Sequence, residues 1–411
     1  MSLIRPFAAL RPSPGHAGDV AAPPYDVVSA DEARRMVAGR PWSFLHVSRA
    51  EVDLPPDTDP YAPVVYAKAR ENLDRMLAAG ILVRDPSPCL SVYRLTQSGH
   101  AQTGLVAAAS VAAYDQGRIK RHELTRPAKE DDRVRQIEAL NAQTGPVFLA
   151  YRAAQSIDGL LSRASEAAPD VSVSADDGVL HELWTVRDGP TLAELVSRFD
   201  ALDALYIADG HHRCAAAARI AAARRPTRPD PEAAHQHFLA VIFPHDQLRI
   251  LPYNRVVRDL NGLSASAFLA RLGEAFVVEQ AADPVQPAEP AQFGLYLDGR
   301  WHRLRLDPAL IPSDDPVARL DVSLLQDHLI GPLLGITDPR RDERIDFVGG
   351  IRGLGGLAAR VDSGEMRVAL SLHATAMDEL IAVADAGEIM PPKSTWFEPK
   401  LADGLVSHVL D

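Results

Sequence analysis

Short apolar segments alternate with amphipathic ones along most of this chain, and this alternation restricts its fold more than any other feature. Strand-like apolar runs occupy residues 90–96, 103–112, 147–152, 183–186, 202–208 and 238–243. Segments with helical periodicity occupy residues 61–79, 129–144, 157–167, 191–199 and 215–224. Because each amphipathic helix buries its apolar side against a sheet, the pattern predicts a mixed α/β fold of mixed sheets covered by helices.

Length suggests more than one packed lobe. A chain of 411 residues exceeds what one hydrophobic core usually supports, so we expect two or three lobes. We place an N-terminal α/β lobe at 1–152, a central lobe at 153–260 and a C-terminal α/β lobe at 261–411. Other expected elements are a strand at 43–48, a surface loop at 226–232, a hairpin at 293–306, a helix at 321–334 and a flexible turn at 349–356.

Charge and cysteine content narrow the class of partner. The net charge of −12 argues against nucleic acid and acidic membranes, because both select a basic surface. The two cysteines, Cys89 and Cys214, imply no disulfide framework, and no Cys/His spacing suggests zinc. No apolar run is long enough to span a bilayer. We expect a cytoplasmic protein whose partner is a small molecule, with neither haem, flavin nor zinc, and we leave open a homodimer.

Residues 209–213, Asp-Gly-His-His-Arg, join an apolar strand to an Ala-rich helix. Free N–H groups and the positive end of the helix dipole favour an anion there. Gly210 allows close approach of a ligand, while His211, His212 and Arg213 offer donors to phosphate oxygens. Asp209 can hold Mg²⁺ or accept a proton from a hydroxyl group. The alternative is an ordinary helix cap and turn, but five such residues in succession favour a phosphate site.

Two further polar clusters are candidates. The first cluster, at residues 122–135, begins with His122 and Glu123 and contains Arg126, Lys129 and Arg133. These side chains can supply a general base and phosphate ligands. The alternative is an ordinary solvent-exposed helix. Near the C-terminus, Lys393, Ser394, Thr395 and Lys400 occupy a Pro-rich stretch. That stretch combines cations with hydroxyl groups, as phosphate-binding loops do, but it lacks the glycines of a Walker loop. The alternative interpretation is a structural clasp.

Two resemblances extend this interpretation. The turn at 209–213 resembles the phosphate-binding turn of the ParB/sulfiredoxin superfamily, which includes the free serine kinases. The chain as a whole resembles the DUF1015 family, a domain of unknown function. The motifs that carry this second resemblance lie at residues 23–27, 122–127, 132–133, 209–213, 248–252 and 390–395. The first resemblance implies a strand–turn–helix that grips nucleotide phosphates.

Together these observations predict a nucleotide-dependent phosphotransferase acting on a small hydroxy compound such as serine, in either direction. We expect ATP or ADP with Mg²⁺ as cofactors. Catalysis is assigned to Asp209, Glu123, His212 and Lys393, and substrate contacts to Tyr25, Asp26, His122 and Arg126. Two alternatives stay open: a phosphoserine-type phosphatase, and a nucleotide-sensing module without catalysis.

Overall fold

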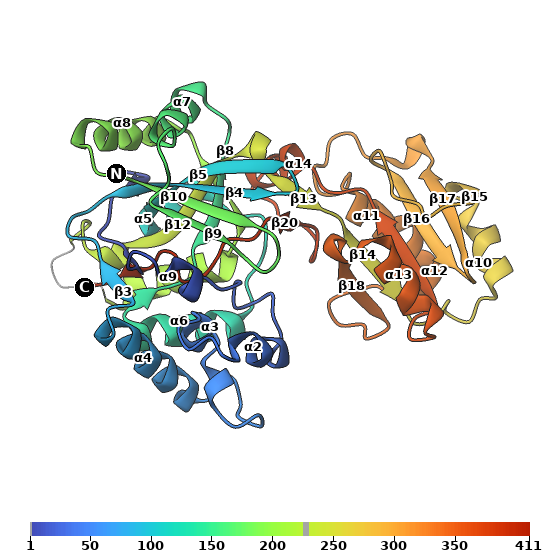
Figure 1. The fold of residues 1–411 in the computed structure, drawn as a ribbon. Helices are drawn as coiled ribbons and strands as arrows, with labels where there is room; N and C mark the ends of the chain where they lie inside the picture. The colour runs from blue at the N-terminus through green and yellow to red at the C-terminus, as the bar shows by residue number, and fades with distance from the viewer. Residues whose placement is uncertain (1, 225–229) are drawn as a thin grey trace. The chain divides into compact units, whose positions relative to one another are not determined.

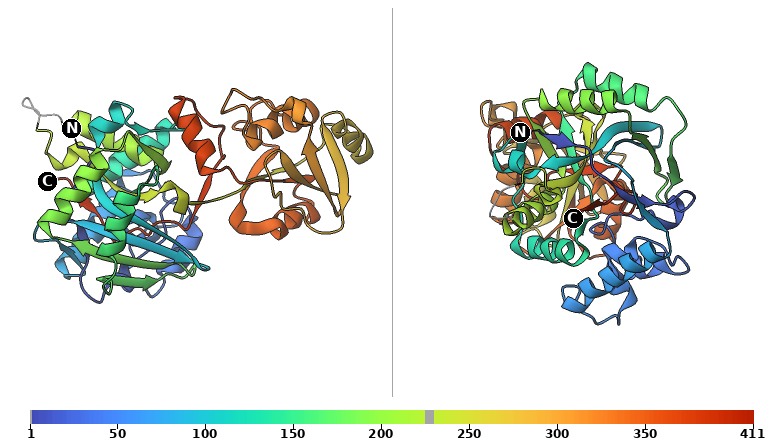
Figure 2. Two further views of the ribbon diagram at one scale, coloured as in Figure 1. Left: turned by 90° about the horizontal axis from the view of Figure 1, so that it is seen from above. Right: turned by 90° about the vertical axis from the view of Figure 1, so that its left-hand side faces the viewer.

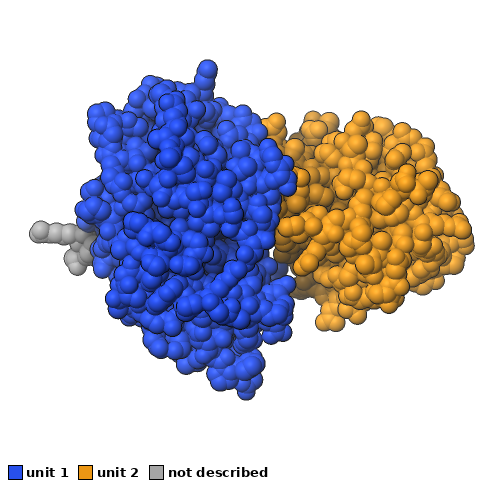
Figure 3. Space-filling view, in the orientation of Figure 1, with its two compact units in different colours: residues 1–248, 399–411 blue, residues 249–398 orange. Residues whose placement is uncertain are grey.

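A computed structural model of the chain describes residues 2–224 and 230–411 (Figure 1). The chain divides into two compact units, one formed by Met1–Leu248 with Pro399–Asp411 and the other by Arg249–Glu398 (Figure 3). This division differs from the three expected lobes. Strands from both sides of the expected boundary at 152 pair in one sheet, so no division of the chain falls there.

The first unit is built on a large mixed sheet with the strand order β6-β11-β8-β12-β5-β4-β10-β9, to which β1 adds by pairing with β5. The strands β6 and β11 are parallel, as are β8 and β12, and the other pairs are antiparallel. In chain order its strands are β1 (Ile4–Arg5), β4 (Leu90–Gln97), β5 (His100–Ser110), β6 (Ile119–Lys120), β8 (Val147–Tyr151), β9 (Val171–Ser174), β10 (Leu180–Val186), β11 (Leu205–Asp209) and β12 (His237–Pro244).

One face of this sheet carries the main hydrophobic core. Alternate residues such as Leu149, Ile207 and Ala240 point to this face, as the two-residue period of a strand requires. They pack against helices that share the same core. These helices are α5 (Val111–Asp115), α7 (Gln155–Ala164), α8 (Gly189–Asp200) and α9 (His211–Ala223). The mixed α/β architecture of helix-covered sheets is therefore confirmed.

A second, helical core forms the N-terminal part of the same unit, on the opposite side from α7 and α8 (Figures 1 and 2). It contains α1 (Ala17–Val20), α2 (Ala30–Val37), α3 (Leu45–Ser48) and α4 (Pro63–Ala78), and α6 (Pro127–Leu140) contacts α4. The expected strand at 43–48 is wrong: Phe44, Leu45 and Val47 belong to this helical core. A short apolar run does not distinguish a strand from a buried helix, so tertiary packing decided between them.

The last residues of the chain return to the first unit. Two short pairs hold the ends there, β2 (Leu10–Pro12) with β3 (Leu82–Arg84) and β7 (Ala142–Gln143) with β21 (His408–Val409). The backbone of Asp403 also pairs with Ala22. Within the described residues, no helix has both the length and the apolar character needed to cross a membrane.

The second unit contains a sheet of order β15-β17-β16-β19-β14-β18 and a small pair, β13 (Arg249–Leu251) with β20 (Trp396–Glu398). The strands of its main sheet are β14 (Tyr253–Val257), β15 (Phe276–Ala281), β16 (Gln292–Leu297), β17 (Arg300–Leu306), β18 (Ile345–Gly349) and β19 (Val368–Leu372). Its helices include α10 (Ala265–Leu272), α11 (Asp321–Leu325), α12 (Gly331–Leu334), α13 (Gly353–Asp362) and α14 (Met377–Asp385).

Two local expectations can be compared with the structure of the second unit. The hairpin is confirmed, because β16 and β17 join through Asp298 and Gly299, which both have positive φ (50° and 72°). The flexible turn at 349–356 is wrong, since α13 begins at Gly353 and buries Leu357 in the core of this unit. That burial outweighs the weak helix propensity of glycine. The loop expected at 226–232 lies partly outside the described residues.

Candidate functional site

The turn after β11 is a strand–turn–helix whose conformation depends on Gly210. Gly210 has φ of 104° and is the N-cap of α9, so His211, His212 and Arg213 form the first helical turn instead of preceding a helix at 215. A Cβ at position 210 would stand only 3.0 Å from Nε of Arg213. The first N–H groups of a helix lack helical acceptors, so this end of α9 favours an anion.

Two cations converge on Asp209. Nζ of Lys400 lies 3.2 Å from Oδ2 of Asp209, and Nη2 of Arg213 lies 3.6 Å from Oδ1. Burial alone would raise the pKa of Asp209, but the charges of Lys400 and Arg213 outweigh it and hold that pKa well below its usual range. Asp209 is therefore a fixed anion that organises two cations. With both carboxylate oxygens engaged, it is poorly placed for the roles of general base and Mg²⁺ ligand expected of it.

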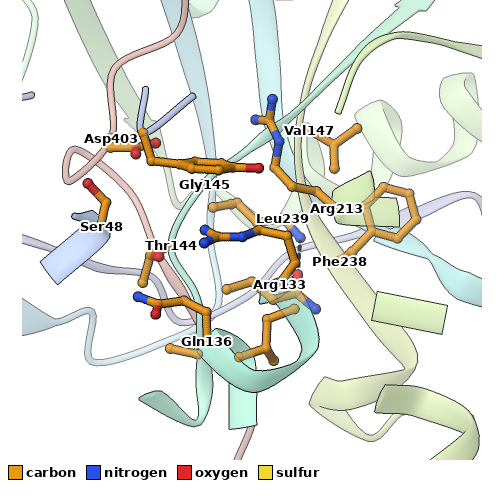
Figure 4. A pocket seen from close by; sticks show the side chains of 14 residues that line it. Ser48, Arg133, Gln136, Thr144, Gly145, Val147, Arg213, Phe238, Leu239 and Asp403 are labelled. Carbon is orange, nitrogen blue, oxygen red and sulfur yellow. Dashed lines mark hydrogen bonds between the residues drawn. The ribbon is translucent and has the colours of Figure 1, made fainter. Parts of the chain in front are cut away.

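Arg213 and Arg133 line a small cavity in the first unit, of about 30 Å³ (Figure 4). Arg213 comes from α9 and Arg133 from α6, while Asp403 comes from the returning C-terminal segment. The guanidinium of Arg133 lies 3.8 Å from the ring centre of Tyr25 and 2.7 Å from Asp132. A cavity of this size with two guanidinium groups suits a small anion, such as a phosphoryl group, rather than a whole nucleoside.

Asp403 is a buried carboxyl group of the same cavity, and no local signal in the sequence marked it. Burial raises the pKa of Asp403 to about 7, although the nearby charge of Arg213 opposes this. Asp403 as a whole residue is only 2% exposed. Because its place in the cavity depends on a chain reversal far from the turn, only a long-range contact could have revealed it.

Tyr25 and Asp26 are brought to the same region by the N-terminal segment. Oδ2 of Asp26 lies 4.0 Å from Nη2 of Arg213. Burial raises the pKa of Tyr25 to about 12 despite the adjacent Arg133. The sequence-predicted residues Tyr25, Asp26, Arg133, Asp209, Arg213 and Lys400 therefore lie together, although they come from four separate parts of the chain.

The segment before α6 contacts the start of α9. Oε2 of Glu123 lies 3.6 Å from Nδ1 of His211, and the rings of His122 and His211 meet edge to face at 4.5 Å between centres. Burial lowers the pKa of His122 to about 4, and burial followed by the charge of His122 lowers the pKa of His211. Both imidazoles are neutral near pH 7 and can accept a bond or bind a metal through one nitrogen.

His212 contacts the segment before α6 through a hydrogen bond. Its Nε2 accepts the backbone N–H of Arg126 at 3.0 Å, which ties the segment before α6 to α9. The side chain of Arg126 is exposed, and Lys129 donates to the hydroxyl of Tyr61 at 2.9 Å. These contacts place the backbone of Arg126 beside the turn and engage Lys129 with an aromatic side chain.

Lys393, Ser394 and Thr395 belong to the second unit and make local contacts there. Nζ of Lys393 lies 5.2 Å from the ring centre of Tyr253. Ser394 donates to the carbonyl of Pro391 at 2.6 Å, and its own carbonyl accepts from Thr375 at 3.0 Å. The described contacts of this loop are those of a structural clasp.

Lys400 also lines a second cavity, of about 100 Å³, between the N-terminal segment and β9. The lining is mainly apolar and includes Pro24, Leu45 and Leu401, with His181 among its polar groups. Lys400 therefore lines this mainly apolar cavity and also pairs with the carboxylate of Asp209 at the turn before α9.

The fold and this site together define a mixed α/β protein with a strand–turn–helix suited to anions. A family model described as "Protein of unknown function (DUF1015)" matches residues 4–323, and the chain belongs to this family. No curated protein matches the chain.

Among solved structures, the chain is similar to a free serine kinase in complex with AMP, with 13% identity, 73% of this chain and 92% of that chain covered, and a TM-score of 0.35. A conserved hypothetical protein from Pyrococcus furiosus has 14% identity over 72% and 93% of the two chains, with a TM-score of 0.34. SbnI from Staphylococcus aureus, with a C-terminal truncation, has 12% identity over 72% and 85%, with a TM-score of 0.37.

Proposed function

We propose that the first unit binds the phosphates of a nucleotide at residues 210–213 and transfers a phosphoryl group to a small hydroxy compound, serine being the first candidate. One observation carries this proposal. A helix N-terminus, Arg213 and Lys400 are assembled around one partly exposed carboxylate, that of Asp209, at the end of a strand, beside a cavity large enough for a phosphoryl group. Such preorganised donors stabilise charge that shifts during phosphoryl transfer.

The larger cavity supports a nucleotide over free phosphate. It is mainly apolar, as binding sites for planar organic groups commonly are, and Lys400 lines it while bonding to Asp209. A nucleoside in this cavity would place its phosphates toward the turn. ATP and ADP are both compatible with this arrangement.

Glu123 is the better general base. Its side chain is 48% exposed, so an acceptor can reach it, whereas Asp209 is paired with two cations. In the proposed step the acceptor hydroxyl gives its proton to Glu123 and its oxygen forms a bond to phosphorus. The bond from phosphorus to the leaving nucleotide oxygen breaks, and Arg213 and Lys400 balance the charge on the phosphoryl oxygens.

The test is a direct one on the full-length protein. ATP and ADP are titrated by calorimetry, and each is then incubated with serine and Mg²⁺ while phosphoserine is followed by mass spectrometry. Binding followed by phosphoserine formation supports the proposal. If neither nucleotide binds, the proposal fails.

Two other results would point to a different function for the same site. Release of phosphate from phosphoserine in the absence of nucleotide would identify a phosphatase. Tight nucleotide binding without turnover of any hydroxy compound tested would identify a nucleotide-sensing module.

A further inference from the structure

Beside the anion-binding turn, His122, Glu123 and His211 form a separate cluster. One potential ligand atom from each of these residues lies within 4.8 Å of the others. His122 and His211 are each 3% exposed, while the Glu123 side chain is 48% exposed. The cluster therefore has two buried imidazoles on one side and an accessible carboxylate on the other.

The hydrogen bonding of His122 leaves a ligand atom available. Within the part of the chain that the structure describes, its buried Nδ1 has no hydrogen-bond partner. The ring also bonds to the backbone of Ile207, and this bond therefore comes from Nε2. A ring that donates from Nε2 to a carbonyl carries its lone pair on Nδ1, which is the orientation that supporting contacts give to metal-binding histidines.

We propose that His122, Glu123 and His211 hold one divalent transition-metal ion. Two imidazoles and a carboxylate suit ions such as Mn²⁺ or Zn²⁺, whereas Mg²⁺ and Ca²⁺ prefer oxygen ligands alone. Three protein ligands leave positions for water or substrate, as in catalytic metal sites. His212 is not part of this cluster, and its Nε2 accepts the N–H of Arg126 at 3.0 Å. The corresponding bond at His211, from the N–H of His122 to Nε2, is longer at 3.4 Å, and Nδ1 of His211 faces Glu123 at 3.6 Å.

This inference goes beyond nucleotide binding and does not depend on it. It is also compatible with Glu123 as a base, because a carboxylate bound through one oxygen keeps the other for a proton. The ion would stand next to the first residue of α9 and so close to the anion-binding turn. It would be distinct from Mg²⁺ carried by a nucleotide.

The experiment uses metal alone. Full-length protein treated with chelator and freed of it is titrated by calorimetry with MnCl₂, ZnCl₂ and MgCl₂, without nucleotide. We expect one Mn²⁺ or Zn²⁺ per chain. Glu123→Gln and His211→Ala should each weaken that binding at least tenfold. Glu138→Gln, a matched change at an exposed position of α6, should leave it unchanged.

The metal titrations can overturn the proposed metal site. Absence of Mn²⁺ and Zn²⁺ binding overturns the proposal, as does binding to Glu123→Gln and His211→Ala with wild-type affinity, or equal affinity for Mg²⁺. Because Glu123 is half exposed, the Glu123→Gln variant should retain its melting temperature and tests the site even if His211→Ala does not fold. Nucleotide titration in the presence of chelator separates the two proposals, since either ligand can bind while the other fails.

Discussion

Arg213 links Asp209 to the small cavity: its side chain is 12% exposed, Nη2 lies 3.6 Å from Asp209 and the residue lines the cavity. We expect Arg213→Ala to weaken nucleotide binding by about 1.5 to 3 kcal/mol, on the order of ten- to a hundredfold in Kd, as for lost hydrogen bonds to charged groups. Isothermal titration with ADP measures this.

Arg219 provides the matched control for that change. It lies on the same helix and pairs with Asp131 at 2.8 Å, but its side chain is 46% exposed. Arg219→Ala should leave Kd unchanged, since exposed ion pairs contribute little. Equal losses in both variants would show that the effect comes from damage to α9 and not from a missing phosphate ligand.

The raised pKa of Asp403 predicts that the stability of the folded protein depends on pH. Its pKa is raised from 3.8 to about 7 in the folded protein, so the folded state keeps a proton that the unfolded state loses. This group's contribution to stability is complete below pH 4 and is lost as pH rises through 7. Asp403→Asn should therefore lose less stability than the wild type between pH 5.5 and 8, as measured by urea unfolding. Parallel pH profiles of the two proteins would contradict this assignment.

Among elements, the strand–turn–helix of β11 and α9 depends on a single glycine. Gly210→Ala forces a side chain into φ of 104° and against Arg213, which should cost about 1 to 2 kcal/mol or more of the free energy of unfolding. Gly159→Ala, in the interior of α7, should instead stabilise the protein by about 0.5 to 1 kcal/mol, because alanine favours helices there. Chemical denaturation compares them, and a neutral Gly210→Ala would show that the turn relaxes freely.

At the scale of the whole molecule, the two units have separate hydrophobic cores. We expect differential scanning calorimetry to resolve two transitions. A nucleotide bound by the first unit should raise the melting temperature of one transition and leave the other in place. A single transition that moves as a whole would show that the units unfold together.

Asp321 offers a way to assign the transition of the second unit. Burial raises the pKa of Asp321 to about 7, and its Oδ2 lacks a hydrogen-bond partner among the described residues. Its contribution to stability is lost as pH rises through 7, so Asp321→Asn should raise the melting temperature of the second unit at pH 8. The same substitution should not change the transition that responds to nucleotide. An effect on the nucleotide-responsive transition would contradict the division into two units.

Local sequence patterns determined much of this protein by themselves. Periodicity placed most strands and helices, and the turn residues Asp298 and Gly299 predicted a hairpin. The pattern at 209–213 identified the strand–turn–helix, because a glycine with polar neighbours between an apolar strand and a helix is a short-range feature. Signals of this kind depend on residues that are close in the sequence.

Only the tertiary structure decided which distant residues meet. Three contacts at the site join segments that are far apart in the chain. Lys400 pairs with Asp209, Asp403 lines the cavity beside Arg213, and the ring of His122 packs against that of His211. The apolar run at 43–48 likewise became helical because of the core that it joined. Burial and charge at a site depend on such long-range packing, and so they follow from the folded chain and not from any short stretch of it.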